Sequence, residues 1–265
     1  MRLVDETGLF AEAADYIDSW HYAVGGARNA GDVEVIPEQQ GWVARMQHTG
    51  NDEAVVFAAR QSYRAGSRGL SDKDIALIGH LMNHRHTSPF EHCTLTVHVR
   101  APLVVWWQWV RHRTFSYSLS SGRYTKFDAD EIMVPVEWRG KSETNKQGSA
   151  GPVDDEYQEL LNSMWDSFSH ASVFNYEVAV NNFGVAPEQA RMFLPGFACM
   201  YDGMVTGNLY NWFHFVALRE ANEAQKEIRQ YAIAIRKILM ECYPICYEAY
   251  ARYMLPKYQP IEVKK

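Results

Sequence analysis

Two periods of hydrophobic residues divide this chain into predicted strands and predicted helices. Between His92 and Arg100, apolar and polar side chains alternate at every position. Strict alternation is typical of a strand with one buried and one exposed face, so cysteine, leucine and valine are expected inside, and threonine, histidine and arginine outside. A shorter alternation in residues 33–37 predicts an opening strand, and residues 127–138 are expected to be mostly extended.

Elsewhere the apolar positions recur with the 3.6-residue period of a helix. Ser71 and Asp74 have the spacing of a capping box, and Asn208 has the position of a cap residue for a later helix. The apolar stripe in residues 154–184 is expected to be buried core rather than a cofactor cradle. The predicted helices cover residues 51–63, 71–86, 102–110, 154–184, 187–195 and 207–240.

Two segments show neither the alternation of a strand nor the 3.6-residue period of a helix. Residues 1–32 are acidic and alanine-rich, and glycines at 25, 26 and 31 break any helix there. We expect an N-terminal extension that lies on a partner or stays mobile, followed by one domain over residues 33–260. Residues 140–152 are polar and glycine-rich, which predicts a surface loop.

Composition excludes several classes of protein. A chain of 265 residues, 47% hydrophobic and 22% charged, can bury a substantial single core. The net charge of -6 argues against nucleic-acid binding, so a basic cluster would serve a small anion such as a nucleotide. No apolar run approaches the roughly 20 residues that span a bilayer, and the N-terminus carries acids where a secretory signal carries bases. We therefore expect a cytoplasmic protein.

Cysteine and histidine spacings raise two metal hypotheses. Cys242 and Cys246 lie one helical turn apart, but no second ligand pair accompanies them, so buried thiols are expected at all four cysteines. Histidines at 80, 84 and 86 have a spacing that suits zinc, yet no carboxylate or cysteine stands nearby, and histidines at a helix end also cap carbonyl groups. We expect no metal.

The segment Arg111–Tyr124, RHRTFSYSLSSGRY, concentrates anion-binding and hydroxyl groups. Arginine forks match phosphate oxygens in pairs and stay charged at working pH. A solvated basic turn is the alternative interpretation. The apolar helix before it argues for a site, because on a continuous helix Gln108, Arg111 and His112 would share one face, and buried polar groups need partners.

The same segment resembles the motif of the flavin-dependent thymidylate synthases, in which RHR is followed by seven residues and a serine. Here Thr114–Ser120 separate Arg113 from Ser121, and Gly122, Arg123 and Tyr124 also match. The resemblance extends over residues 33–255. It implies an α+β single domain with a mixed or antiparallel sheet packed against long helices, and a homotetramer with shared sites.

The resemblance also implies an activity. It is the reductive C5-methylation of a uracil nucleotide, dUMP to dTMP, with FAD as cofactor, methylenetetrahydrofolate as carbon donor and NADPH as reductant. No catalytic thiolate is needed, and Arg219 would ionise the uracil ring at N3. Ser121 need not act as a nucleophile. The implied flavin-binding residues are His86, Ser88, Arg111, His112, Arg113, Asn208 and His214, and the implied nucleotide-binding residues are Gln108, Arg111, Leu119, Ser121, Gly122, Arg123, Arg191 and Arg219.

Three positions depart from the family pattern. Leu119 stands where a polar residue is usual, Glu223 replaces a histidine four residues after Arg219, and Tyr210 replaces an arginine of some members. Glu223 is expected to form a helix-surface ion pair with Arg219. These changes leave two alternatives open: an enzyme that methylates UMP, or both UMP and dUMP, as in nucleoside-antibiotic biosynthesis, and a flavin- or nucleotide-binding protein without turnover.

Overall fold

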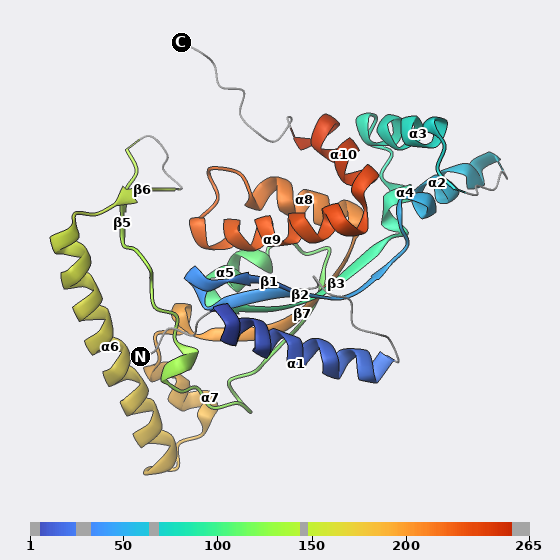
Figure 1. Ribbon diagram of the computed structural model, residues 1–265. Helices are drawn as coiled ribbons and strands as arrows, with labels where there is room; N and C mark the ends of the chain where they lie inside the picture. Colours follow the sequence, from blue (N-terminus) through green and yellow to red (C-terminus); the bar gives the residue numbers. More distant parts are fainter. Residues whose placement is uncertain (1–5, 25–32, 64–68, 144–147, 256–265) are drawn as a thin grey trace.

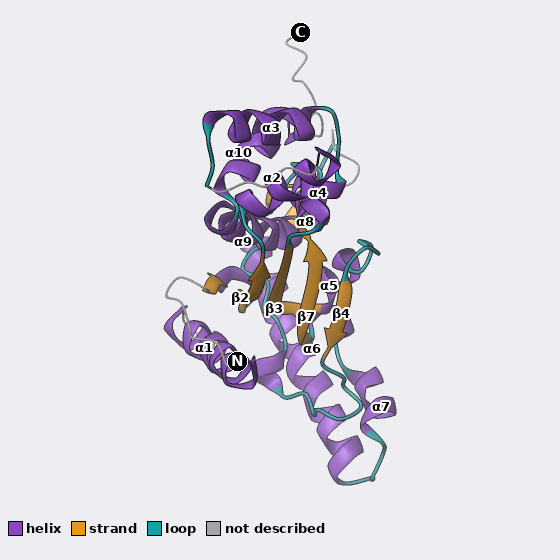
Figure 2. Cartoon of the chain, turned by 90° about the vertical axis from the view of Figure 1, so that its right-hand side faces the viewer, coloured by secondary structure: helices purple, strands orange, loops and turns teal. Residues whose placement is uncertain are grey.

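A five-stranded antiparallel sheet crosses the molecule with the strand order β1-β2-β3-β7-β4, and Figure 2 shows four of these strands side by side. The computed structural model describes residues 6–24, 33–63, 69–143 and 148–255. The sheet is antiparallel, one of the two arrangements expected. Its strands are β1 (Val33–Ile36), β2 (Gly41–Thr49), β3 (Thr94–Pro102), β7 (Met200–Asn208) and β4 (Ser116–Leu119), and a separate hairpin comprises β5 (Arg139–Lys141) and β6 (Ser149–Pro152).

Helices cover both faces of the sheet and one of its ends (Figures 1 and 2). The α-helices are α1 (Glu6–Val24), α2 (Asp52–Arg60), α3 (Asp72–Asn83), α4 (Ser88–Glu91), α5 (Leu103–Trp109), α6 (Asp155–Asn181), α7 (Pro187–Ala190), α8 (Leu209–Arg219), α9 (Lys226–Cys242) and α10 (Pro244–Tyr253). Short 3-10 helices cover Pro37–Gln39, Gln61–Tyr63, Ala129–Glu131, Arg191–Phe193 and Gly196–Ala198.

The main core lies between the sheet and helices α5, α8 and α9. Leu95, Val97 and Val99 point into it from β3, as the alternation predicted, and all three are fully buried. Aromatic rings fill the space above them, with Trp109 stacked on Phe215 at a centroid distance of 4.7 Å. Large rings bury much apolar surface, so this layer holds the end of α5 and the whole of α8 in place.

The opposite face of β3 is also buried at His98 and Arg100, which corrects the expectation that these two residues are exposed. Helix α1 packs across β1 and β2, and Leu9, Ala13 and Ile17 form a core with the sheet. Under this helix, His98 stacks on Trp42 at a centroid distance of 4.9 Å. Residues 6–24 are thus a helix on the sheet, and the glycines at 25, 26 and 31 lie outside the described residues.

A buried arginine accompanies this helix. Arg100 is 8% exposed, and its Nη1 lies 3.3 Å from a carboxylate oxygen of Glu12 on α1 and 3.1 Å from one of Asp202 on β7. Burial raises the pKa of Asp202 to about 6 against the opposing effect of Arg100. The charged residue was predicted outside the sheet, but α1 closes that side.

Local signals predicted helix starts well. Ser71 and Asp74 form the capping box of α3, and the side chain of Asn208 accepts the backbone N–H of Asn211 at the start of α8. The predicted helix over residues 207–240 is divided: α8 ends at Arg219 and α9 begins at Lys226. Residues 140–152, predicted as a loop, contain part of the β5–β6 hairpin.

The apolar stripe of α6 is not buried core in this chain, so that prediction was wrong for the first half of the helix. Tyr157, Leu160, Met164 and Phe168 are each more than half exposed. The second half, through Tyr176 and neighbouring residues, packs into a satellite core with α7 and the segment before β7, and Trp165 of the first half packs against the same core. Figure 1 shows α6 lying along one side of the molecule. A helix with such an exposed apolar face is typical of an interaction surface.

Candidate functional site

The RHR residues lie in a tight turn between α5 and β4. Helix α5 ends at Trp109, so Arg111 and His112 do not continue the helical face of Gln108 as predicted. The turn buries His112 and leaves Arg111 and Arg113 exposed. The Tyr117 hydroxyl lies 2.8 Å from the carbonyl oxygens of both Trp109 and His112, which fixes the turn against β4.

Arg219 and His112 form the centre of this part of the site. The Nε of Arg219 donates to Nε2 of His112 at 2.9 Å, and its Nη2 donates to the carbonyl oxygen of Gln108 at 3.1 Å. Burial, then Arg219 and His214, lowers the pKa of His112 to about 4, so the imidazole is neutral near pH 7 and accepts the hydrogen bond. A guanidinium in a partly desolvated place acts more strongly than one in water.

The other residues implied for the flavin lie on elements next to this centre. The rings of His214 and His112 are 6.0 Å apart, and Asn208 caps the same helix, α8. Asn208 also pairs with Thr94 of β3, while Ser88 opens α4, which packs on α8. His86 is exposed before α4. Burial, followed by Arg219, lowers the pKa of His214.

A second group gathers beyond the far end of β4. Arg123 forms an ion pair with Glu188, Nε to Oε2 at 3.0 Å, and Nε of Arg191 donates to the backbone oxygen of Glu188 at 3.1 Å. Gly122 is buried beside them, and a Cβ there would lie 2.6 Å from the ring of Phe127. The turn at Ser121 is closed by its carbonyl oxygen, which accepts from residues 124 and 125. The structure thus brings Ser121, Arg123 and Arg191 together, as the prediction of a phosphate site requires.

The two groups occupy different ends of one strand. His112 precedes β4 and Ser121 follows it, and a four-residue strand spans about 13 Å. The predicted site residues therefore form a buried half-site around Arg219 and an exposed half-site around Arg123.

The departures from the family pattern have structural explanations. Leu119 pairs with Gly203 of β7, and its Cδ2 occupies the space that a side chain at position 203 would need. Tyr210 packs against the main core. Glu223 lies beyond the end of α8, and Arg219 bonds to His112 instead, so the expected Arg219–Glu223 pair is absent from the ion pairs of the described chain.

Neither metal hypothesis gains support. The rings of His80 and His84 are 4.1 Å apart and that of His86 is 6.0 Å from His80, but within the described ranges no three histidine, cysteine or acidic side chains are grouped as a metal site. All four cysteines are buried and none of them forms a disulfide, as predicted. Burial raises the pKa of Cys93 to about 11 and that of Cys199 to about 12, which disfavours a thiolate nucleophile.

Sequence reasoning missed three residues that the structure brings to these half-sites. Tyr117 anchors the turn, Glu188 pairs with Arg123, and Gln225 accepts a 2.6 Å hydrogen bond from Nε2 of Gln108. Glu188 stands three residues before Arg191, a helical spacing that signals proximity. For Gln225 no local signal exists, because its partner is 117 residues away.

Comparison with known proteins identifies the family to which the chain is similar. The family model described as thymidylate synthase complementing protein matches residues 46–245. The flavin-dependent thymidylate synthase of Thermus thermophilus is 41% identical over 217 residues, 82% of this chain and 77% of its own length. That of Anaplasma marginale is 38% identical over 218 residues, 82% of this chain and 74% of its own.

A solved structure supports the same family. The UMP/dUMP methylase PolB from Streptomyces cacaoi, bound with 5-Br dUMP, superposes with a TM-score of 0.71 at 28% identity, covering 80% of this chain and 95% of that one. The fold and the motif define an enzyme of the flavin-dependent thymidylate synthase type. The chain belongs to the thymidylate synthase complementing protein family. Among the helices described, none has the length and apolar character needed to cross a membrane.

Proposed function

We propose that this protein methylates C5 of a uracil nucleotide, converting dUMP to dTMP, with methylenetetrahydrofolate as carbon donor, FAD as cofactor and NADPH as reductant. The observation that carries the proposal is the half-buried hydrogen bond between Arg219 and neutral His112 beside an exposed cationic turn. A guanidinium against the N3–C4 edge of uracil stabilises negative charge where it develops on the ring, which makes C5 nucleophilic.

Neutral His112 helps Arg219 in this role. Because His112 is neutral, it accepts a hydrogen bond from Nε of Arg219 and adds no positive charge beside the guanidinium. The carbonyl oxygen of Gln108 accepts a hydrogen bond from Nη2. The guanidinium is therefore held in one plane, and its other N–H groups are left for the nucleotide. Orientation of this kind lowers the cost of reaching the transition state.

The exposed half-site supplies the phosphate anchor in this proposal. Arg123 and Arg191 provide guanidinium donors, and Ser121 adds a hydroxyl on the same turn. Phosphate binding would replace the carboxylate of Glu188 on Arg123, because both are anions that match the same fork. Leu119, between the two half-sites, gives the nucleotide an apolar contact.

The residues around the RHR turn fit a flavin dinucleotide. Arg111 and Arg113 are exposed, and neither side chain forms an ion pair with any residue that the structure describes. Two unpaired guanidinium groups suit a diphosphate. Asn208, His214, Ser88 and His86 are proposed to bind the rest of the cofactor. When bound, FAD supplies the reducing equivalents that it receives from NADPH.

A homotetramer with shared sites is part of the proposal. In a single chain the two half-sites stand at opposite ends of β4, and the exposed face of α6 offers apolar surface for another copy. Light scattering after size-exclusion chromatography should give four chains. Replacing Leu160 and Met164 by lysine should lower the assembly state and the activity together, because charges would be buried in the interface.

The nucleotide preference is tested by assaying the two nucleotides side by side. Purified protein with flavin, NADPH and methylenetetrahydrofolate receives dUMP or UMP, and the methylated products are measured by mass spectrometry. We expect a larger kcat/KM for dUMP. Equal or faster methylation of UMP would favour the second candidate, a dual UMP/dUMP methylase, for which the likeness to the Streptomyces cacaoi enzyme is the supporting observation. No product from either nucleotide would contradict both.

A further inference from the structure

The amide of Gln108 is held by a residue outside the motif. Its Nε2 donates to Oε1 of Gln225 at 2.6 Å. Both side chains are half-buried, Gln108 on α5 and Gln225 directly before α9. An amide has one donor end and one acceptor end. Because the donor end of Gln108 faces Gln225, its acceptor atom Oε1 is turned away from Gln225.

Helix capping does not account for Gln225. The residue occupies the N-cap position of α9, yet its side chain makes no capping hydrogen bond. N-caps favour serine, threonine, aspartate and asparagine, whose short side chains reach the first backbone N–H groups. The amide oxygen of Gln225 is directed at Gln108 instead.

Gln108 is also the residue that supports Arg219. Its carbonyl oxygen accepts from Nη2 of Arg219 at 3.1 Å, while its side chain is bound to Gln225. Contacts therefore run from Gln225 through Gln108 to Arg219 and from there to His112. A change at Gln225 alters the direction of one amide at the buried half-site without removing any charge from it.

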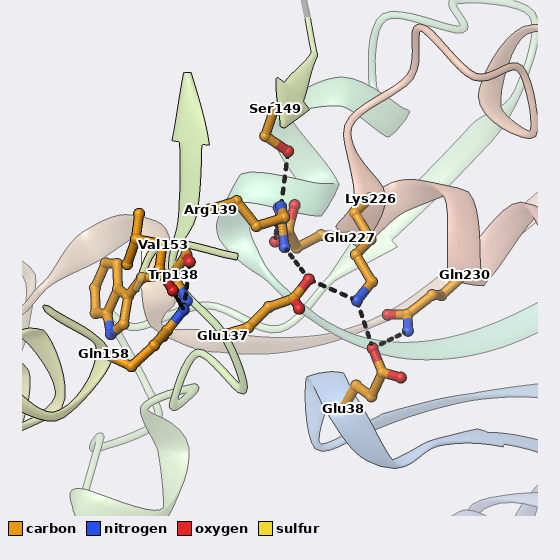
Figure 3. Close-up of polar contacts among 10 residues, drawn as sticks. All are labelled: Glu38, Glu137, Trp138, Arg139, Ser149, Val153, Gln158, Lys226, Glu227 and Gln230. Carbon is orange, nitrogen blue, oxygen red and sulfur yellow. Dashed lines mark hydrogen bonds and ion pairs between the residues drawn. The ribbon is translucent and has the colours of Figure 1, made fainter. Parts of the chain in front are cut away.

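Strong polar contacts fix the start of α9, and with it Gln225. Figure 3 shows the Lys226 ammonium between Glu137 and Glu38, at 2.8 and 3.4 Å. The next residue, Glu227, accepts from Nη2 of Arg139 at 2.6 Å. These contacts connect α9 to the β5–β6 hairpin and to the turn after β1. They hold the backbone of Gln225 where its side chain meets Gln108.

We propose that Gln225 is a positioning residue for nucleotide recognition: by accepting from Gln108, it aims the Oε1 of Gln108 at a hydrogen-bond donor of the uracil nucleotide. The inference rests on the proposed function and deepens it. Gln225 does not contact the nucleotide itself. Its effect is therefore expected in nucleotide affinity, with flavin content unchanged.

Three substitutions at Gln225 separate orientation from packing. Gln225→Met keeps the length and removes the acceptor. Gln225→Glu offers only an acceptor, so Gln108 still donates to it. Gln225→Lys offers only a donor, which turns the amide of Gln108 round. The matched control is Gln230→Met, which removes another amide of α9; it donates to Glu38 at 2.6 Å, so the control also shows how much the Glu38 contacts at the start of α9 contribute without any change at Gln225.

The measurement is the KM for dUMP and the calorimetric Kd for dUMP on the flavin-loaded enzyme. Loss of one oriented hydrogen bond should raise both by about 3- to 10-fold in Gln225→Met and at least as much in Gln225→Lys. Gln225→Glu should stay within about twofold of the wild type, as should the Gln230→Met control. If Gln225 acts by orienting Gln108, the loss of dUMP affinity should increase in the order Gln225→Glu, Gln225→Met, Gln225→Lys.

Two results would overturn the inference. If Gln225→Met matches the Gln230→Met control, or if Gln225→Glu is as impaired as Gln225→Lys, the side chain has no orienting role, while methylation by the wild type keeps the proposed function intact. If the wild type neither binds nor methylates a uracil nucleotide, both proposals fail. Should Gln225→Met not fold, the contrast between the glutamate and lysine variants decides.

Discussion

The two half-sites at the ends of β4 differ in how their cations are held. Arg219 is half-buried and bonded to neutral partners, a histidine nitrogen and a peptide oxygen. Arg123 is exposed and paired with a carboxylate, Glu188. A half-buried cation with neutral partners is less screened and its charge stays available to a ligand, whereas an exposed ion pair is screened by solvent and exchanges readily. The first arrangement suits ring activation and the second suits reversible capture of a phosphate.

The largest effect is expected at the buried half-site. Arg219→Ala should lower kcat/KM for methylation by about 100- to 1000-fold while the purified protein stays yellow, because a single preorganised charge-stabilising group typically contributes that much. Activity and flavin absorbance of the same preparation are compared. The exposed Arg252→Ala should match the wild type in both. Full activity in Arg219→Ala would refute ring activation by this residue.

The second largest effect is expected from acid, which should lower the free energy of unfolding through His112. The pKa of His112 is lowered from 6.5 to about 4, so the unfolded chain binds the extra proton between these pH values. Stability that is present above pH 6.5 is thus lost as pH falls toward 4, by about 3 kcal/mol. Urea unfolding of wild type and His112→Asn at pH 7, 5.5 and 4.5 measures it.

The variant comparison isolates this contribution. Asp202, with its pKa raised to about 6, acts in the opposite direction, since its protonated form is favoured in the folded chain. It is present in both proteins and cancels in the difference. The stability gap between wild type and His112→Asn should therefore shift in favour of the variant as pH falls. A gap independent of pH would contradict a neutral, buried His112.

Flavin binding tests the exposed face of the RHR turn. Arg111→Ala should weaken FAD binding by about 10- to 100-fold, since each arginine–phosphate contact carries charge-assisted hydrogen bonds. Fluorescence titration of the apoprotein with FAD gives the Kd, and Arg252→Ala again serves as the control. If Arg111→Ala keeps its flavin, the cofactor diphosphate lies elsewhere.

The smallest effect is expected at Glu188. Glu188→Gln removes the anion that competes for Arg123, so the Kd for dUMP should fall by about two- to threefold, a small change because the pair is exposed. Glu248→Gln breaks a similarly exposed pair with Arg252 and should change nothing. Weaker dUMP binding in Glu188→Gln would show that the carboxylate supports the site instead of occupying it.

Sequence patterns predicted the elements that depend on neighbours in the chain. The antiparallel strand before Arg100, the capping box at Ser71 and the cap at Asn208 all formed as expected. They could be predicted because alternation and capping are local. The family and the α+β fold were also confirmed, since the RHR motif is long enough to identify them.

Other features depend on distant partners and were missed. His98 looked solvent-facing, but α1 covers it; the stripe of α6 looked buried, but four large apolar side chains in its first half are each more than half exposed. Nothing in the sequence near Gln225 reveals its contact with Gln108. The individual roles of the site residues stay predictions, because the geometry shows which groups meet and not what they bind.

The close fit of Leu119 over Gly203 makes the glycine the less replaceable of the two residues. A Cβ at position 203 would overlap with Cδ2 of Leu119 and would lie 3.0 Å from both the backbone oxygen of Ser118 and the ring of Trp106. The end of the leucine side chain is flexible and can shift, whereas the backbone oxygen and the ring stay in place when Leu119 is changed. Directed evolution of this pair of strands should therefore accept new residues at position 119 more readily than at position 203.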